Sequence, residues 1–201
     1  MQQLAQERGY PFAQLPTGLQ PRHAAFYSLK ALVTVLEHAH IVGADSAEAE
    51  LHKASEYVKQ CVSSWRADVP TGDNIAKQLA QELSGSTPVV YAGPLMYAAA
   101  YKWKISFNEN AKNVAWCNQF PEFNHNEFLG WTSHPIDKPY KTLILTSSFE
   151  HERTQKRFAV TGKLLSGRWP QPQVIEAKGE TLLEQLLYTI ALGDFVSIYL
   201  A

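Results

Sequence analysis

From residue 87 onward, three short strand-like runs alternate with three longer segments of helical pattern. The runs are residues 87–93 (TPVVYAG), 142–148 (TLILTSS) and 172–179 (PQVIEAKG). Buried runs of this kind, separated by helices, are typical of a parallel sheet that is covered on both faces. The pattern predicts an α/β fold, a three-layer sandwich around a parallel sheet.

The three helical segments are residues 94–112, 150–165 and 180–201. Ligands of such sheets bind beyond the carboxyl ends of the strands. This rule indicates two candidate places, Gly93 with the helix that follows it and the TSS run at 146–148. Phosphate at the TSS run would meet Glu150 and Glu152, so a cluster that caps the next helix is the favoured interpretation there.

The first 84 residues have a different pattern. The expected elements are a short strand at 10–16 and helices at 22–43, 46–64 and 73–83, the last capped by Thr71 or Asp73. These elements would make a poor free-standing domain. We therefore predict a helical connecting segment at 1–84, the tail of another α/β unit plus linker helices, and one α/β domain at 85–201.

The charge balance excludes some classes of partner. With 18 basic and 19 acidic residues, the chain has a formal net charge of −1 and no field that would attract nucleic acid or an anionic membrane. The densest basic cluster, at 153–157, has helical spacing and is interpreted as a solvated face. Two cysteines without metal-type spacing, no apolar run that approaches a membrane span and no signal-like N-terminus indicate a cytoplasmic protein.

Residues 107–131 combine asparagines, acids and a histidine with aromatic residues. Glu109 stands late on an expected helix, and His125 follows sixteen residues later on the expected loop. A carboxylate and an imidazole that converge on one ligand can divide proton transfers between carbon and oxygen. A surface glutamate and a hydrogen-bonded loop histidine remain the alternative.

Two other kinds of chemistry can be weighed from the residues. His125, Glu127, His134 and Asp137 are metal-ligand types, but their spacing matches no helical zinc motif, so we predict no metal and no cofactor. Arg22 stands at an expected helix start, where a cation opposes the helix dipole. It either binds an anionic intermediate or is an ordinary exposed arginine.

The segments FNENAKN (107–113) and FPEFNHNEFLGW (120–131) resemble the bifunctional phosphoglucose/phosphomannose isomerases. This branch of the phosphoglucose isomerase superfamily is built from sugar isomerase (SIS) domains, and it pairs an N-E-N-x-K helix end with P-E-x-x-H-N. The resemblance extends to residues 16–22, 160–165 and 192–201. It implies an SIS-type, flavodoxin-like fold.

The resemblance also implies a reaction: glucose 6-phosphate, and mannose 6-phosphate, interconvert with fructose 6-phosphate through a cis-enediol. Glu109 would move the proton between C1 and C2, His125 would assist ring opening, and Arg22 would stabilise the enediolate. Three polar neighbours are expected to orient His125: Glu122, Asn124 and Asn126.

Members of the family have two SIS subdomains, and this chain departs from that pattern. The resemblance implies that this sequence begins after the first subdomain, with its sugar-phosphate loop, and ends before a catalytic lysine that the family places beyond a segment like 192–201. The resemblance implies a sugar-phosphate substrate, a missing N-terminal SIS half as partner, a homodimer, and a place in glycolysis and gluconeogenesis. We expect an isomerase module that is incomplete by itself; the alternative is a non-catalytic SIS domain that binds a sugar phosphate or serves in dimerisation.

Overall fold

The computed structural model describes residues 2–42, 46–133 and 139–201, and it divides the chain into two compact units after Lys53. The elements of the first unit are α1 (Gln2–Glu7), the 3-10 helix η1 (Pro21–His23), α2 (Ala25–His38) and the start of α3 (Ala47–Val62). The short strand predicted at 10–16 is wrong, since these residues lie outside regular elements. Prolines at positions 11 and 16 remove two of the donors that a strand would use.

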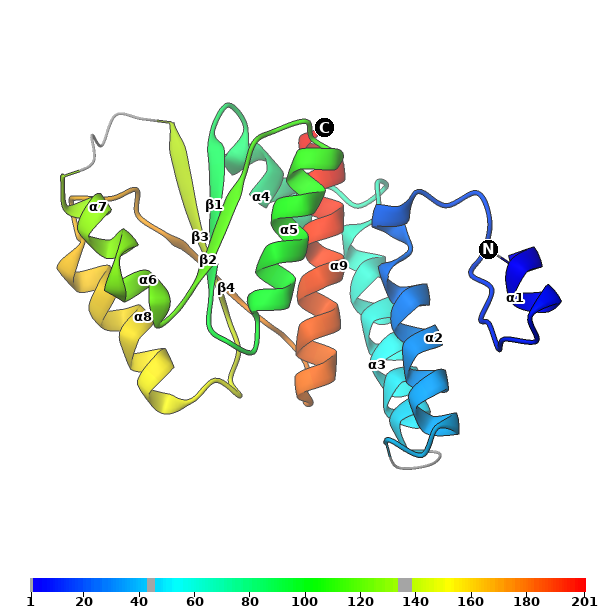
Figure 1. Ribbon diagram of the computed structural model, residues 1–201. Helices are drawn as coiled ribbons and strands as arrows, with labels where there is room; N and C mark the ends of the chain where they lie inside the picture. Colours follow the sequence, from blue (N-terminus) through cyan, green and yellow to red (C-terminus); the bar gives the residue numbers. More distant parts are fainter. Residues whose placement is uncertain (1, 43–45, 134–138) are drawn as a thin grey trace. The chain divides into compact units, whose positions relative to one another are not determined.

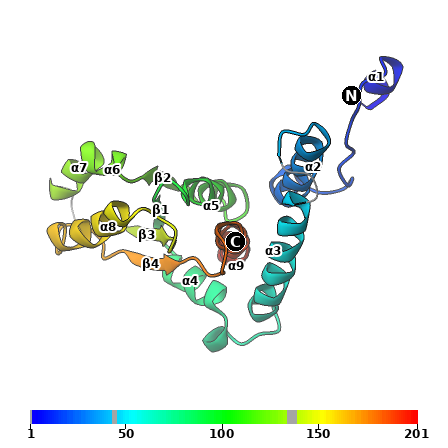
Figure 2. The same cartoon turned by 90° about the horizontal axis from the view of Figure 1, so that it is seen from below.

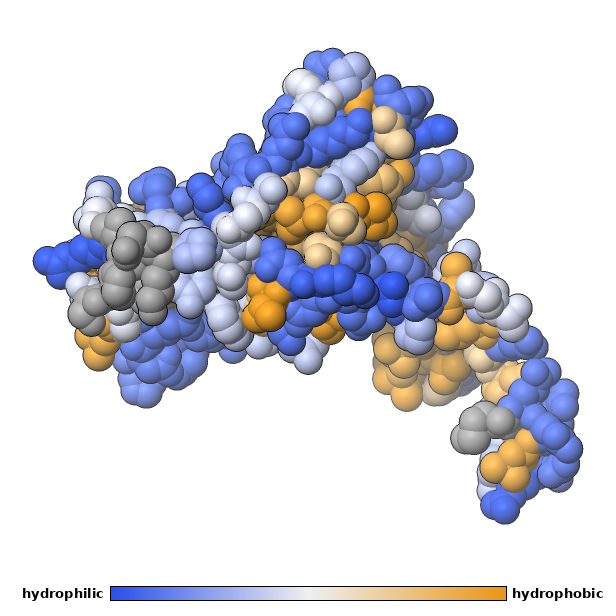
Figure 3. Space-filling view, turned by 90° about the horizontal axis from the view of Figure 1, so that it is seen from above, coloured by the Kyte–Doolittle hydropathy of each residue, from blue (hydrophilic) through white to orange (hydrophobic). Residues whose placement is uncertain are grey.

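Helix α2 leaves a large part of its apolar surface exposed within the first unit. It contains no buried residue, and Leu32 and Val35 are each more than half exposed. Figure 3 shows apolar side chains gathered over this part of the chain. Polar contacts join α2 to α3: the Glu48 amide donates to Glu37 over 2.8 Å, and Lys30 pairs with Glu48 at 3.3 Å. The described part of the first unit therefore lacks a closed apolar core of its own.

The second unit is built on a four-stranded parallel sheet in the order β2-β1-β3-β4. The strands are β1 (Thr87–Ala92), β2 (Trp116–Gln119), β3 (Tyr140–Thr146) and β4 (Gln173–Glu176). Three of them occupy the predicted places, which confirms the parallel α/β fold. The fourth, β2, lies inside the polar-aromatic segment, where no strand was predicted. Its sequence WCNQ is short and partly exposed at the sheet edge, so it carries no apolar run that would signal a strand.

Helices cover both faces of this sheet. The helices of the second unit are the remainder of α3, then η2 (Ser63–Trp65), η3 (Thr71–Asp73), α4 (Ile75–Leu83), α5 (Tyr97–Glu109), α6 (Glu122–His125), α7 (Glu127–Ser133), α8 (Glu152–Leu164) and α9 (Leu182–Leu200). Figures 1 and 2 show α4, α5 and α9 on one side of the sheet and α6, α7 and α8 on the other. This arrangement is the predicted three-layer sandwich.

Helix α4 belongs to the core of the second unit, although the predicted connecting segment included it. Leu79 and Leu83 of α4 are buried in the same apolar cluster as residues of α9. The helix is capped by Asn74, whose side-chain oxygen accepts from the amides of Ala76 and Lys77 at 3.1 and 3.2 Å. The predicted caps, Thr71 and Asp73, instead form the preceding 3-10 turn.

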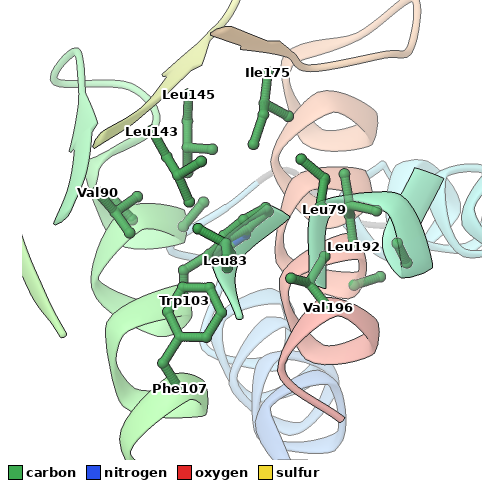
Figure 4. Close-up of a cluster of buried hydrophobic side chains, with 14 of the residues drawn as sticks. Leu79, Leu83, Val90, Trp103, Phe107, Leu143, Leu145, Ile175, Leu192 and Val196 are labelled. Carbon is green, nitrogen blue, oxygen red and sulfur yellow. The ribbon is translucent and has the colours of Figure 1, made fainter. Parts of the chain in front are cut away.

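Each face of the sheet has its own apolar cluster. The larger one joins β1 and β3 to α4, α5 and α9, with Trp103 and Phe107 fully buried at its centre (Figure 4). The other is aromatic and includes Tyr91, Phe123 and Trp169. By length and composition α9 would suffice to cross a membrane, contrary to the expectation from the sequence, but half of that stretch is buried in the first cluster. This burial identifies it as a core helix.

Candidate active site

Glu109 is the last residue of α5 and is exposed. The helix follows β1 and runs back along the sheet, so it ends near the point where the strands begin (Figure 1). Two side chains fix that end. Asn110 donates to the Ser197 hydroxyl at 2.9 Å, and Asn113 donates to the carbonyl of Ser86, just before β1, at 2.8 Å. Glu109 therefore lies near the amino-terminal ends of the strands.

A buried polar group holds the same stretch of α5 against α9. Lys102 pairs with Asp194, both side chains being less than a fifth exposed, and Ser106 donates to the same carboxylate at 2.7 Å. Ser106 also accepts from Lys102 at 2.7 Å. These contacts lie one and two turns before Glu109 and fix the helix that carries it. Sequence reasoning missed them, because helix spacing alone does not identify the partner helix.

His125 lies at the other end of the strands, near their carboxyl ends. It ends α6, which follows the carboxyl end of β2, where the amide of Phe120 donates to the carbonyl of Ala92 at 2.8 Å. The 13 residues of α5 extend about 20 Å from this end of the strands to Glu109. Within one chain, Glu109 and His125 therefore do not share a cleft, and the predicted convergence of the two on one ligand does not occur within the chain.

The polar neighbours of His125 divide into two sets. Glu122 contacts the imidazole directly, with its oxygen 3.1 Å from Nδ1, and Asn126 donates to that same oxygen at 2.8 Å. Asn124 instead reaches α8, where it donates to Thr161 at 2.9 Å and accepts from Arg157 at 3.5 Å. His125 itself is 79% exposed. Its ring is thus oriented by Glu122 and accessible to a ligand from outside.

The candidate ligand place at Gly93 is occupied by the carboxylate of Glu150. Glu150 is buried and accepts from the Leu95 amide at 2.8 Å, just before α5. A Cβ at position 93 would collide with this carboxylate, so glycine is required for the close approach. Burial raises the pKa of Glu150, partly offset by the backbone amides of Leu95 and Met96. The positive end of α5 is therefore neutralised from within.

The TSS run is also satisfied internally. Gln185 of α9, itself buried, accepts from the Ser147 hydroxyl at 2.6 Å and donates to the Ser148 hydroxyl at 2.8 Å. The same amide donates to the carbonyl of Gly179 at 3.0 Å. The favoured interpretation of this run as a helix cap is wrong, because α8 begins at Glu152 and is capped by the ring of His151. The serines join β3 to α9 instead.

Three further candidates can be placed. Among the described residues, no three His, Cys, Asp or Glu side chains come together as a metal site, and His134 and Asp137 lie outside those residues. The basic residues at 153, 156 and 157 are exposed, as predicted, and they border an open hollow of about 450 Å³ that Asn124 also lines. Arg22 is in η1 of the first unit and donates to Gln20 at 2.8 Å.

A parallel four-stranded sheet between two helical layers, with an exposed glutamate at one helix end and an exposed histidine after the edge strand, defines an open three-layer α/β domain. Residues 72–201 match the family model described as the bacterial phospho-glucose isomerase C-terminal SIS domain. The chain belongs to that family.

Individual relatives agree with this assignment. The chain is 30% identical over 197 residues to the bifunctional phosphoglucose/phosphomannose isomerase of Aquifex aeolicus, covering 98% of this chain and 57% of the relative. It is 28% identical to the enzyme of the same name from Caldicellulosiruptor bescii, covering 100% and 59%. The chain thus spans somewhat more than half the length of these relatives. In fold it is similar to a glucose-6-phosphate isomerase like protein from Thermus thermophilus, with a TM-score of 0.70 at 19% identity over 92% of this chain and 62% of that one.

Proposed function

We propose that this chain is a catalytic module of an aldose–ketose isomerase that interconverts glucose 6-phosphate, and mannose 6-phosphate, with fructose 6-phosphate through a cis-enediol. The family match carries this proposal, because residues 72–201 include both Glu109 and His125. Glu109 is the carbon base, and His125, held by Glu122, transfers the proton of ring opening. Arg22 stabilises the charge of the enediolate, a role that the resemblance implies.

The site is proposed to be shared between two copies. Glu109 lies near the amino-terminal ends of the strands and His125 near their carboxyl ends, so a single copy presents the two side chains on different surfaces. In a two-fold dimer, residue i of one copy meets residue j of the other, and the contact occurs twice. Glu109 of one copy and His125 of the second then act on one substrate.

The phosphate group is proposed to be held by a further SIS half. Both candidate ligand places in the second unit are already occupied by side chains of the domain itself, one by Glu150 and one by Gln185. The relatives are longer than this chain, which spans 57% of the Aquifex aeolicus isomerase. The 201-residue chain alone is then expected to show no turnover of fructose 6-phosphate. A fusion that adds the part of the Aquifex aeolicus isomerase outside the match is expected to show turnover.

The fusion allows a complementation experiment. Glu109→Gln and His125→Gln should each abolish isomerisation of fructose 6-phosphate. After unfolding and refolding together in equal amounts, half of the dimers are mixed and each carries one intact site, so about a quarter of the wild-type activity should return. A folded, dimeric fusion without activity would favour the alternative, a non-catalytic SIS domain for dimerisation. Activity of the mixture no greater than that of the separate variants would overturn the shared site.

A further inference from the structure

Glu127 opens α7 two residues after His125, and its carboxylate points back into the sheet. One oxygen accepts from the hydroxyl of Tyr91 on β1, and the other accepts from the amide of Asn118 on β2 at 2.7 Å. The Tyr91 hydroxyl accepts from the indole of Trp131, one turn along α7, at 2.9 Å. A single carboxylate thus joins the first turn of α7 to two neighbouring strands.

This network is partly or wholly removed from water. Tyr91 is fully buried, Trp131 is 6% exposed, and Asn118 and Glu127 are half-buried. Burial, together with the adjacent Glu127 carboxylate, raises the pKa of Tyr91, so its hydroxyl stays protonated and donates. A charged acceptor makes both hydrogen bonds stronger than neutral ones. Removal of the carboxylate would leave the hydroxyl of the fully buried Tyr91 without its acceptor.

The second fixed point lies on the other side of His125. Asn124 is bound to Thr161 of α8, and Phe123 packs on Tyr91 with ring centroids 4.6 Å apart. Only His125 and Asn126 separate this anchor from Glu127. Because α6 has only four residues, its own helical hydrogen bonds cannot hold the imidazole in place. The two anchors determine the path of the backbone between them.

We propose that Glu127 is the positioning residue for His125. It touches no substrate; it binds the segment to β1 and β2 and so determines where the exposed imidazole and its partner Glu122 stand. This proposal rests on the proposed function, because the catalytic role of His125 is part of that function. The position of the His125 ring can nevertheless be measured without turnover.

The test compares Glu127→Gln with Glu82→Gln, an acid-to-amide change at an exposed position of α4. The readout is the ¹H–¹³C signal of the His125 ring in this chain, identified by its loss in His125→Gln. Glu127→Gln should shift, broaden or split that signal in a protein that remains folded by circular dichroism, and Glu82→Gln should leave it unchanged. A purely structural role would lower the melting temperature without a selective effect on this ring, and that result would overturn the proposal.

If Glu127→Gln does not fold, Asn118→Ala provides the second variant. This substitution removes the Asn118 amide that donates to the Glu127 carboxylate, at a half-buried position, and should also shift, broaden or split the His125 ring signal. An unchanged signal would overturn the proposal. In the active fusion, Glu127→Gln should lower kcat by roughly 10- to 100-fold with little change in KM, the scale of a small misplacement of a reacting group. Absence of activity in the wild-type fusion would count against the proposed function, while the ring signal still tests the positioning.

Discussion

Polar residues in two regions of the second unit have opposite surroundings. At the carboxyl ends of β1 and β3, Glu150 and Gln185 are buried and bound to backbone amides, hydroxyls or a carbonyl. At the end of α5 and on α6, Glu109 and His125 are exposed. The first region is where ligands of open α/β sheets usually bind, yet its groups are already satisfied. A polar group at the carboxyl ends of the strands is thus not by itself a binding site, because its hydrogen bonds can already be satisfied within the fold.

The largest effect on stability is expected at Gln185. Gln185→Ala removes three side-chain hydrogen bonds that join α9 to Ser147, Ser148 and Gly179. It should lower the free energy of unfolding by about 2–4 kcal/mol, because the buried Ser147 hydroxyl loses its acceptor and two further hydrogen bonds of α9 are lost. Urea unfolding followed by circular dichroism measures the change. Gln60→Ala, at an exposed position of α3, is the control and should change it by less than about 0.5 kcal/mol. Equal effects of the two substitutions would contradict the interpretation of the TSS run as structural.

A smaller and pH-dependent effect is expected at Glu150. Its pKa in the folded state is raised above the ordinary value of 4.5, so the folded chain binds this proton more tightly than the unfolded chain. The resulting stabilisation is fully present below about pH 4.5 and is lost as the pH rises through the folded pKa.

Glu150→Gln removes this titration while keeping an oxygen that can accept from Leu95. The difference in unfolding free energy, wild type minus variant, should therefore fall in urea titrations as the pH rises above about 4.5. Glu82→Gln, exposed on α4, serves as the control and should show no such trend. A difference that rises with pH would mean that the amides of Leu95 and Met96 outweigh burial and lower the pKa of Glu150, which would contradict this prediction.

Local pattern predicted those parts of the fold that are encoded locally. The strands β1, β3 and β4 and the helix α9 follow from runs of residues, and Thr181 with Glu184 forms the capping box that opens α9. The strand β2 could not be predicted, because its partly exposed residues WCNQ depend on pairing with β1 for their conformation.

In the candidate site, too, contacts between neighbours in the sequence could be predicted and contacts between distant residues could not. Spacing and resemblance selected Glu109 and His125, and the contact of Glu122 with His125 joins neighbours on one short helix. The contact of Glu150 with Leu95 spans 55 positions and that of Tyr91 with Glu127 spans 36. Such pairs depend on how the elements pack, and a single sequence carries no periodic signal for them. The distance between Glu109 and His125 has the same origin, since the direction of α5 relative to the sheet separates two residues that the sequence places sixteen apart.

The smallest effect on stability is expected at the two exposed residues. Glu109→Gln and His125→Gln should each change the free energy of unfolding by less than about 0.5 kcal/mol, because neither side chain is buried. Urea unfolding measures this, with Gln185→Ala as the destabilised reference. The same two substitutions should abolish isomerisation in the fusion with the Aquifex aeolicus segment. Loss of activity without loss of stability would indicate a side chain that acts on the substrate and does not contribute to the packing of the domain. If either substitution destabilised the chain by more than about 1 kcal/mol, on the order of one lost buried hydrogen bond, that residue would belong with Glu150 and Gln185 as part of the scaffold.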